Sequence, residues 1–143
     1  GRLQLVGKNP TVLVDAAHNP HGAAALAKAL ESFFTFDEVV LVFAALADKD
    51  AEGILREIAP HVTSIIVTTI DSERATEPAK LADLAATVVG AENVVVIPDS
   101  AVAVAAARAR VADSERGAVL VAGSVVLVGE VMTQAAHTNG WTQ

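Results

Sequence analysis

The sequence predicts an α/β fold: a Rossmann-like, mostly parallel sheet of about six strands, with helices on both faces and one antiparallel edge strand. Short β-branched apolar runs alternate with segments of about 10–15 residues whose apolar positions recur at helical spacing, the pattern of right-handed βαβ units. Hydrophobic residues make up 52% of the 143 residues but aromatic residues only 3%, so Val, Ala, Leu and Ile must build the core. No repeat or linker interrupts the pattern, so we expect residues 1–143 to form one domain.

The first elements are a hairpin and a helix. Residues 3–6 and Thr11–Val14 are apolar runs on either side of Gly7-Lys8-Asn9-Pro10, whose turn composition predicts an antiparallel pair at a sheet edge. Asn19 and Pro20 predict the start of a helix that runs to about residue 34, because Asn is a good N-cap and Pro suits the first helical position. Further strands are expected at 38–44, 64–69, 94–97 and 118–122, and further helices at 51–59, 78–89 and about 100–111.

Polar residues mark where several of these helices begin. Asp50 is a plausible N-cap for the helix 51–59, and either Asp99 or Ser100 caps the Ala-rich helix that follows. The segment 123–136 is expected to be a closing helix, although its Val content leaves a strand open. Residues 137–143 have the composition of a polar, flexible tail.

Composition excludes several classes of function. The formal net charge of −7 argues against a nucleic-acid partner, since phosphates demand a basic surface. No apolar run reaches the roughly 18 residues of a membrane span, and no signal peptide opens the chain. With no Cys there is no disulfide framework, and the four His residues lack a metal-ligand spacing, so no metal site is expected. These features agree with a cytoplasmic protein.

The most informative loop follows the strand Thr11–Val14. Asp15 and His18 lie there, beyond the carboxyl end of a strand, where ligands bind in open α/β sheets. Asp15 is suited to accept hydrogen bonds from sugar hydroxyls, but a loop carboxylate bound to nearby backbone N–H groups is the alternative. His18 is suited to a phosphate or carboxylate beside a helix N-terminus, but a lone His is often structural.

Three more polar residues follow other predicted strands. Lys49 and Arg74 are cations suited to a carboxylate or phosphate, with a solvated surface role as the alternative for each. Ser124 follows Gly123 and is a helix N-cap, a ligand donor, or both. The chain lacks G-x-G-x-x-G and G-x-x-x-x-G-K-[ST], so neither a dinucleotide site nor a P-loop is expected within it.

The hexapeptide 15–20, DAAHNP, resembles the Asp-Gly-Ala-His-Asn-Pro signature of folylpolyglutamate synthases and dihydrofolate synthases, members of the Mur ligase superfamily. Landmarks at 1–3 (GRL), 48–50 (DKD), 123–124 (GS) and 128–130 (VGE) agree in order. The resemblance covers essentially the whole chain, as the C-terminal domain of that family. Two Ala residues stand where Gly is common, at Ala16 and Ala44, and each adds only a methyl group.

The resemblance implies an ATP-dependent ligase that joins L-glutamate to folate or dihydropteroate through an acyl phosphate. ATP and Mg²⁺ would be bound mainly by an N-terminal P-loop domain that this chain lacks, so the chain alone is expected to be inactive. By the same resemblance, Arg2, Asp15 and His18 contact the nucleotide, with His18 also catalytic, while Lys49, Ser124 and Arg74 contact glutamate. The alternatives are a stand-alone binding or interaction module and another Mur-type amide ligase.

Overall fold

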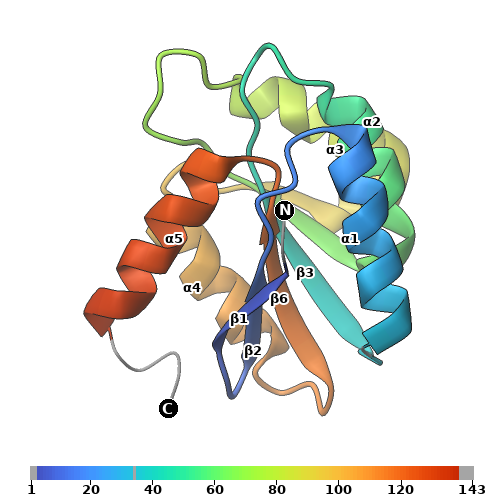
Figure 1. Cartoon of the computed structure of the whole chain (residues 1–143), viewed down its shortest axis with the longest axis vertical. Coiled ribbons are helices and arrows are strands. Elements are labelled where there is room, and N and C mark those ends of the chain that lie inside the picture. Colours follow the sequence, from blue (N-terminus) through green and yellow to red (C-terminus); the bar gives the residue numbers. More distant parts are fainter. Residues whose placement is uncertain (1–2, 34, 139–143) are drawn as a thin grey trace.

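The computed structural model describes residues 3–33 and 35–138 and shows a twisted sheet between two helical layers (Figure 1). The strand order is β1-β2-β6-β3-β4-β5, and the β1–β2 pair is antiparallel while the other four pairs are parallel. The predicted fold class is therefore confirmed, including the antiparallel edge strand. None of the helices described is long and apolar enough to span a bilayer.

The elements alternate along the chain as the sequence predicts, and their bounds differ from the expected ones by one or two residues. The strands are β1 (Gln4–Gly7), β2 (Thr11–Val14), β3 (Glu38–Phe43), β4 (Ser64–Val67), β5 (Val94–Val96) and β6 (Gly117–Ala122). The helices are α1 (Pro20–Phe33), α2 (Ala51–Ile58), α3 (Pro78–Val89), α4 (Ser100–Val111) and α5 (Val125–Thr138), with short 3₁₀ turns at Ala59–His61 and Ala91–Asn93.

Three predicted caps form as expected. The Oδ1 atoms of Asn19, Asp50 and Asp99 accept hydrogen bonds from backbone N–H groups three residues ahead, at 2.8, 2.9 and 3.0 Å. Each bond satisfies one of the N–H groups that a helix start leaves without an internal partner. The helices thus begin where short polar side chains precede them.

The segment after Gly123 is a helix rather than a strand. Leu127, Val131 and Ala135 recur every four residues on one face of α5 and are buried against the sheet, so helical spacing rather than alternation places its apolar side chains. The helix extends to Thr138, two residues into the segment 137–143 that the sequence predicts as a tail. Residues 139–143 lie outside the described part of the chain.

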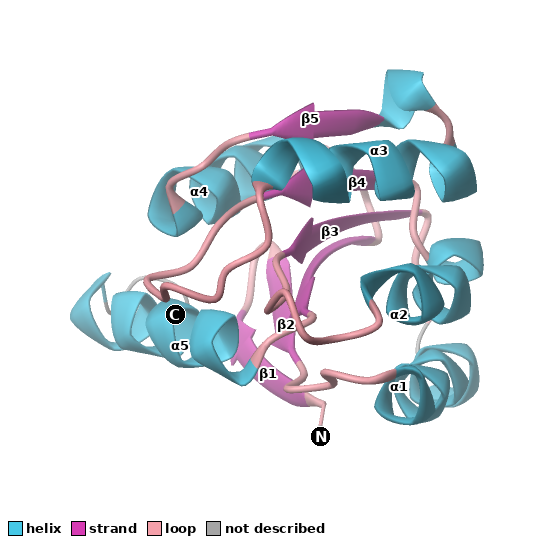
Figure 2. Cartoon of the chain, turned by 90° about the horizontal axis from the view of Figure 1, so that it is seen from above, coloured by secondary structure: helices cyan, strands magenta, loops and turns pink. Residues whose placement is uncertain are grey.

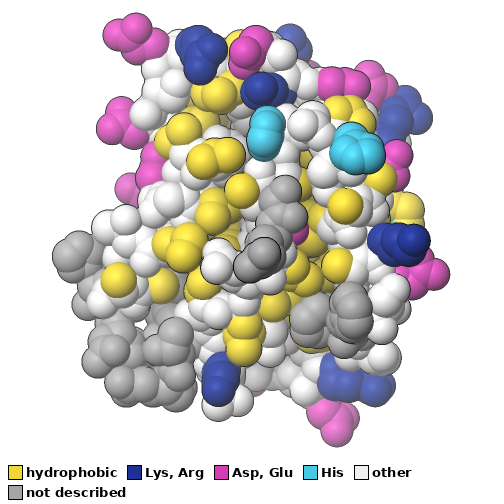
Figure 3. Space-filling view, viewed as in Figure 1, with side chains coloured by type: hydrophobic (Ala, Val, Ile, Leu, Met, Phe, Trp, Pro, Cys, Tyr) yellow, Lys and Arg dark blue, Asp and Glu magenta, His cyan; other side chains and the backbone are white. Residues whose placement is uncertain are grey.

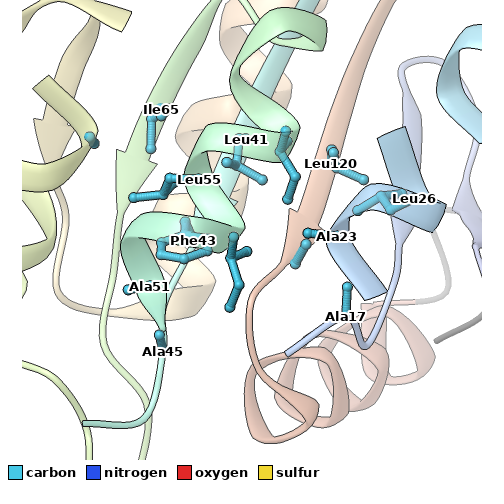
Figure 4. Packing of buried hydrophobic residues seen from close by; sticks show 14 of the residues in the cluster. Ala17, Ala23, Leu26, Leu41, Phe43, Ala45, Ala51, Leu55, Ile65 and Leu120 are labelled. Carbon is cyan, nitrogen blue, oxygen red and sulfur yellow. The ribbon is translucent and has the colours of Figure 1, made fainter. Parts of the chain in front are cut away.

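The sheet separates two hydrophobic cores. Helices α1, α2 and α3 cover one face and α4 and α5 cover the other (Figure 2). Side chains alternate along each strand, so neighbours such as Leu120 and Val119 enter opposite cores. In the first core, Leu41, Phe43 and Leu55 pack together between the sheet and α2 (Figure 4). Burial on both sides explains why the central strands are apolar without interruption.

The position of β6 arranges the ends of the central strands. The chain leaves β2 through α1 and enters β3, and only much later returns through α4 to place β6 between them. Val121 of β6 pairs in parallel register with Val14 of β2 on one side and with Val42 of β3 on the other. The helices that follow β2 and β3 lie on one face, whereas α5, which follows β6, lies on the opposite face. Such a switch opens a crevice beyond the carboxyl ends of the strands.

Candidate functional site

Three chain segments meet beyond the ends of β2, β6 and β3. The Asp15 N–H donates to the carbonyl of Val121 (3.0 Å), and the Gly123 N–H donates to the carbonyl of Ala17 (3.1 Å). Gly123 has a φ of +111°, and a Cβ there would overlap the carbonyl oxygen of Ala44 and a ring carbon of Phe43. Only glycine fits this crossing. The backbone therefore fixes the spacing of the three segments before any ligand binds.

Asp15 is almost fully buried at the base of this crossing. Its Oδ1 accepts a hydrogen bond from the Ala17 N–H at 2.8 Å. Burial raises the pKa of the Asp15 carboxyl group above its ordinary value, and the hydrogen bond from Ala17 opposes that rise. The structure thus shows the carboxylate bound to its own loop, and a contact of Asp15 with ribose hydroxyls stays a prediction.

His18 lies half-buried at the edge of the crevice. Its Nδ1 lies 3.0 Å from the carbonyl oxygen of Ala16, which can only accept, so Nδ1 carries the hydrogen and Nε2 is left for a ligand. Among the described residues other than glycine, only Asn9 has a positive φ. Ala16 therefore occupies ordinary backbone space, and its methyl group in place of the usual glycine costs no strain.

A pocket of about 200 Å³ brings together three of the predicted site residues. It is smaller than the roughly 300–1,000 Å³ typical of drug-sized ligands, so it suits a small substrate or one part of a larger one. Lys49 is half-buried here and forms no ion pair within the part of the chain that the structure describes. The lining consists of His18, Leu46, Lys49, Gly123, Ser124, Val125 and Val126.

Ser124 acts as the N-cap of α5. Its Oγ accepts hydrogen bonds from the N–H groups of Val126 (3.1 Å) and Leu127 (3.4 Å), and the side chain is buried. These bonds use the oxygen as an acceptor and leave the hydroxyl hydrogen available as a donor. Of the two roles that the sequence left open, the structure shows the cap.

Arg74 lies on the same rim as Lys49 but does not line the pocket. Its loop pairs with the Lys49 loop: the Ala47 N–H donates to the Arg74 carbonyl (2.7 Å), and the Thr76 N–H donates to the Ala45 carbonyl (2.9 Å). The Arg74 guanidinium forms an exposed ion pair with Asp48 at 3.5 Å. Arg2, the remaining predicted site residue, lies outside the described residues.

The apolar part of the lining was not anticipated from the sequence. Val125 is 57% exposed and Val126 is 37% exposed in the first turn of α5, although both are large β-branched residues. Figure 3 shows yellow apolar surface over α5, below an upper rim where His, Lys and Arg side chains lie among Asp and Glu side chains. Two exposed Val residues directly after a capping Ser are the signal that could have indicated a binding surface.

A larger cavity of about 360 Å³ lies at the opposite end of the sheet, between the start of β3 and the 3₁₀ turn Ala59–His61. Its lining includes the carboxylates Glu31 and Asp37 but none of the described Lys or Arg residues, and Asp37 is bound to Arg116, at 3.2 Å for the closest pair of atoms. Across the described residues, no group of three or more His, Asp or Glu side chains is arranged to hold a metal ion. We therefore place the candidate site at the smaller pocket.

Comparison with known proteins assigns the family. The family described as Mur ligase, glutamate ligase domain matches residues 1–125. This chain belongs to that family. The resemblance of the chain to the C-terminal domain of folylpolyglutamate and dihydrofolate synthases is likewise confirmed.

Two relatives and one solved structure show how far the similarity extends. The dihydrofolate synthase/folylpolyglutamate synthase of Mycobacterium tuberculosis is 38% identical over 93% of this chain and 30% of its own length. The structure of Mycobacterium tuberculosis folylpolyglutamate synthase complexed with ADP and AMPPCP has a TM-score of 0.89 over 94% of this chain and 32% of that one, also at 38% identity. A second relative is the UDP-N-acetylmuramoyl-L-alanyl-D-glutamate–2,6-diaminopimelate ligase of Synechococcus elongatus. It is 36% identical over 73% of this chain and 22% of its own length. The chain thus spans between 22% and 32% of the length of these three proteins.

Proposed function

We propose that this Mur ligase domain forms part of an ATP-dependent enzyme that joins L-glutamate to folate or dihydropteroate. The observation that carries the proposal is the convergence of His18, Lys49 and Ser124 on one small pocket, in a chain whose relatives are named for this ligation. In the reaction, the amine of glutamate attacks a phosphorylated carboxyl group. The amide bond forms, phosphate leaves, and the amine loses a proton.

Lys49 binds a carboxylate of the incoming glutamate. A carboxylate buried in a closed cleft without a partner is costly, so the site needs a cation, and Lys49 has no protein carboxylate paired with it among the described residues. Its flexible stem lets the ammonium reach a small substrate without a fixed fork geometry. Ser124 donates its hydroxyl hydrogen to the same substrate, and Arg74 is a candidate for a second carboxylate if its pair with Asp48 opens.

His18 contacts the reacting groups through Nε2. Because the carbonyl of Ala16 holds Nδ1–H, the neutral ring offers Nε2 as a proton acceptor for the amine, and the charged ring offers it as a donor to phosphate. Asp15 and Arg2 complete the nucleotide contacts of this domain, with Asp15 accepting from ribose hydroxyls. Closure of the domain over the cleft excludes water, which would otherwise hydrolyse the acyl phosphate.

ATP and Mg²⁺ are held mainly by an N-terminal domain of the whole protein. The chain has no P-loop sequence to cradle a triphosphate, and its described residues offer no cluster of metal-binding side chains. The residues that do fit a nucleotide are the donors at the rim and the buried acid Asp15 at the base of the crossing. We therefore assign this domain the contacts made on closure rather than the primary ATP site.

The test is the Lys49→Ala variant of the full-length enzyme. We expect the KM for glutamate to rise at least ~10-fold, equivalent to about 1.4 kcal/mol, while the KM for ATP changes much less. Steady-state kinetics with glutamate and ATP varied separately measure both values. The matched control is Lys28→Ala on the exposed face of α1, which should change neither KM by more than about twofold.

Two rival functions make different predictions for the same variants. If the domain is a binding module without chemistry, the full-length protein shows no glutamate-dependent release of phosphate, with or without Lys49. If it belongs to another Mur-type ligase, as the similarity to the diaminopimelate-adding relative allows, turnover requires a different acceptor or amino acid. A glutamate KM that stays within twofold of wild type in Lys49→Ala would remove Lys49 as the glutamate contact.

A further inference from the structure

Glu130 links three elements that are distant in the sequence. It lies half-buried in the second turn of α5, and its Oε2 accepts a hydrogen bond from the Asp71 N–H at 2.9 Å. Its Oε1 accepts a hydrogen bond from the Ser100 hydroxyl at the start of α4, at 3.0 Å. Within the described part of the chain it forms no ion pair. Both of its oxygens are therefore used to hold other segments.

The segment that Glu130 holds, residues 70–77, supports the loop that carries Lys49. Leu46 and Ala75 form an antiparallel bridge, flanked by the bonds from the Ala47 N–H to the Arg74 carbonyl and from the Thr76 N–H to the Ala45 carbonyl. Ile70, at the base of the segment, is buried in the second core. Asp71 is the next residue, so the hydrogen bond that its N–H donates to Glu130 fixes the point where the segment leaves the core.

The two walls of the pocket come from different parts of the chain. Ser124 and Val125, at the start of α5, form one wall, and Lys49 and Leu46 form the other. Glu130 lies on α5, the helix whose start forms the first wall. It also binds Asp71, in the segment that supports the second wall. A single carboxylate therefore ties the two walls together across the sheet end.

We propose that Glu130 is a positioning residue, which fixes Asp71 and thereby holds Lys49 at the correct distance from Ser124. The inference rests on the proposed function, in which Lys49 binds glutamate. Glu130 itself touches no substrate. Its role is to keep the pocket pre-organised, so that binding glutamate does not have to order the loop first.

If Glu130 had only a structural role, it would act through its hydrogen bond with Ser100 instead. The Ser100 hydroxyl donates to Glu130 and also accepts from the Gln134 amide at 3.0 Å. These two hydrogen bonds join α4 to α5 without contacting the rim. Ser100→Ala removes both of these hydrogen bonds and leaves the one between Glu130 and the Asp71 N–H. Glu130→Gln keeps an oxygen for the Asp71 N–H and an amide group for Ser100. The two variants separate the two roles.

The first measurement is amide hydrogen exchange of the full-length protein, read in peptides that cover residues 44–50 and 70–77. We expect Glu130→Ala to accelerate exchange in both peptides by about tenfold or more, because an anchor of the segment is lost. In Ser100→Ala and Glu130→Gln both peptides should stay within about threefold of wild type. If Glu130→Ala does not fold, Glu130→Asp, whose shorter side chain cannot reach both donors, replaces it.

The second measurement is the kinetics of the same variants. We expect Glu130→Ala to raise the KM for glutamate by about 3- to 10-fold, to leave the KM for ATP within about twofold, and to be rescued by Glu130→Gln. Unchanged exchange at residues 44–50 in Glu130→Ala overturns the inference, as does an equal acceleration in Ser100→Ala. Failure of the proposed function appears elsewhere, as an unchanged glutamate KM in Lys49→Ala, and exchange alone then decides the role of Glu130.

Discussion

The two ends of the sheet use similar polar residues in opposite ways. At the amino end of the strands, Asp37 pairs with Arg116, while Glu38 accepts from the Ser114 hydroxyl at 2.5 Å and pairs with Arg110 at 3.5 Å. At the carboxyl end, His18 and Ser124 are anchored to backbone groups instead, and Lys49 has no carboxylate within the described residues.

This difference indicates which end of the sheet is the better candidate for binding a ligand. The cavity of about 360 Å³ at the amino end is lined by two carboxylates, Glu31 and Asp37, of which Asp37 pairs with Arg116, and none of the described Lys or Arg residues lines it to bind an anionic ligand. At the carboxyl end, the backbone fixes His18 and Ser124 and leaves Nε2 of the ring and the hydrogen of the hydroxyl group for a ligand. The smaller pocket of about 200 Å³ is the better candidate for this reason. A cation without a carboxylate partner among the described residues, rather than the volume, distinguishes the smaller pocket.

The largest expected effect comes from the crossing that shapes the carboxyl end. Gly123→Ala should lower the free energy of unfolding by about 3 kcal/mol, because the new Cβ combines a positive φ with overlap of the Ala44 carbonyl and the Phe43 ring. Urea denaturation measures this change. Gly129→Ala is the matched control: nothing lies within 4 Å of its Cβ, and Ala there should stabilise α5 by about 0.5–1 kcal/mol. Equal stability of the two variants would contradict the account of the crossing.

A smaller effect tests whether the buried acid belongs to the site. If Asp15 accepts from ribose hydroxyls, Asp15→Ala in the full-length enzyme should weaken nucleotide use by about 10- to 150-fold, the equivalent of about 1.5–3 kcal/mol. Thermal unfolding must be followed in parallel, because the variant also loses the bond from the Ala17 N–H.

The control for that experiment is Asp15→Asn. It keeps an oxygen for the Ala17 N–H while removing the charge, so it should retain the fold. An unchanged KM for ATP and unchanged kcat in a folded Asp15→Ala enzyme would leave Asp15 a structural residue, bound only to its own loop.

The smallest effect is expected at the amino end of the sheet. The ion pair of Arg116 with Asp37 is exposed, with more than half of each side chain accessible, so Arg116→Ala should change the free energy of unfolding by less than about 1 kcal/mol. The KM values for glutamate and ATP should not change. A loss of activity without a loss of stability would show that this end also takes part in function.

The sequence by itself determined the local features of the protein. Helix starts at Asn19, Asp50 and Asp99 were predictable because a cap requires only a short polar side chain beside its own helix. The strands were predictable because burial on both faces leaves continuous apolar runs. The hexapeptide 15–20 carried the family resemblance for a similar reason, since its residues are neighbours along the chain.

Only the tertiary structure decided which loops meet. The insertion of β6 between β2 and β3 places Ser124 beside His18 and Lys49, and nothing local to β6 encodes its neighbours in the sheet. The bond of Glu130 to Asp71 joins residues 59 positions apart, and no spacing rule indicates it. Long-range pairings of this kind are set by how the two cores pack against the sheet. A local pattern can therefore predict the residues of a site, while the packing of the whole chain decides which of them share a pocket.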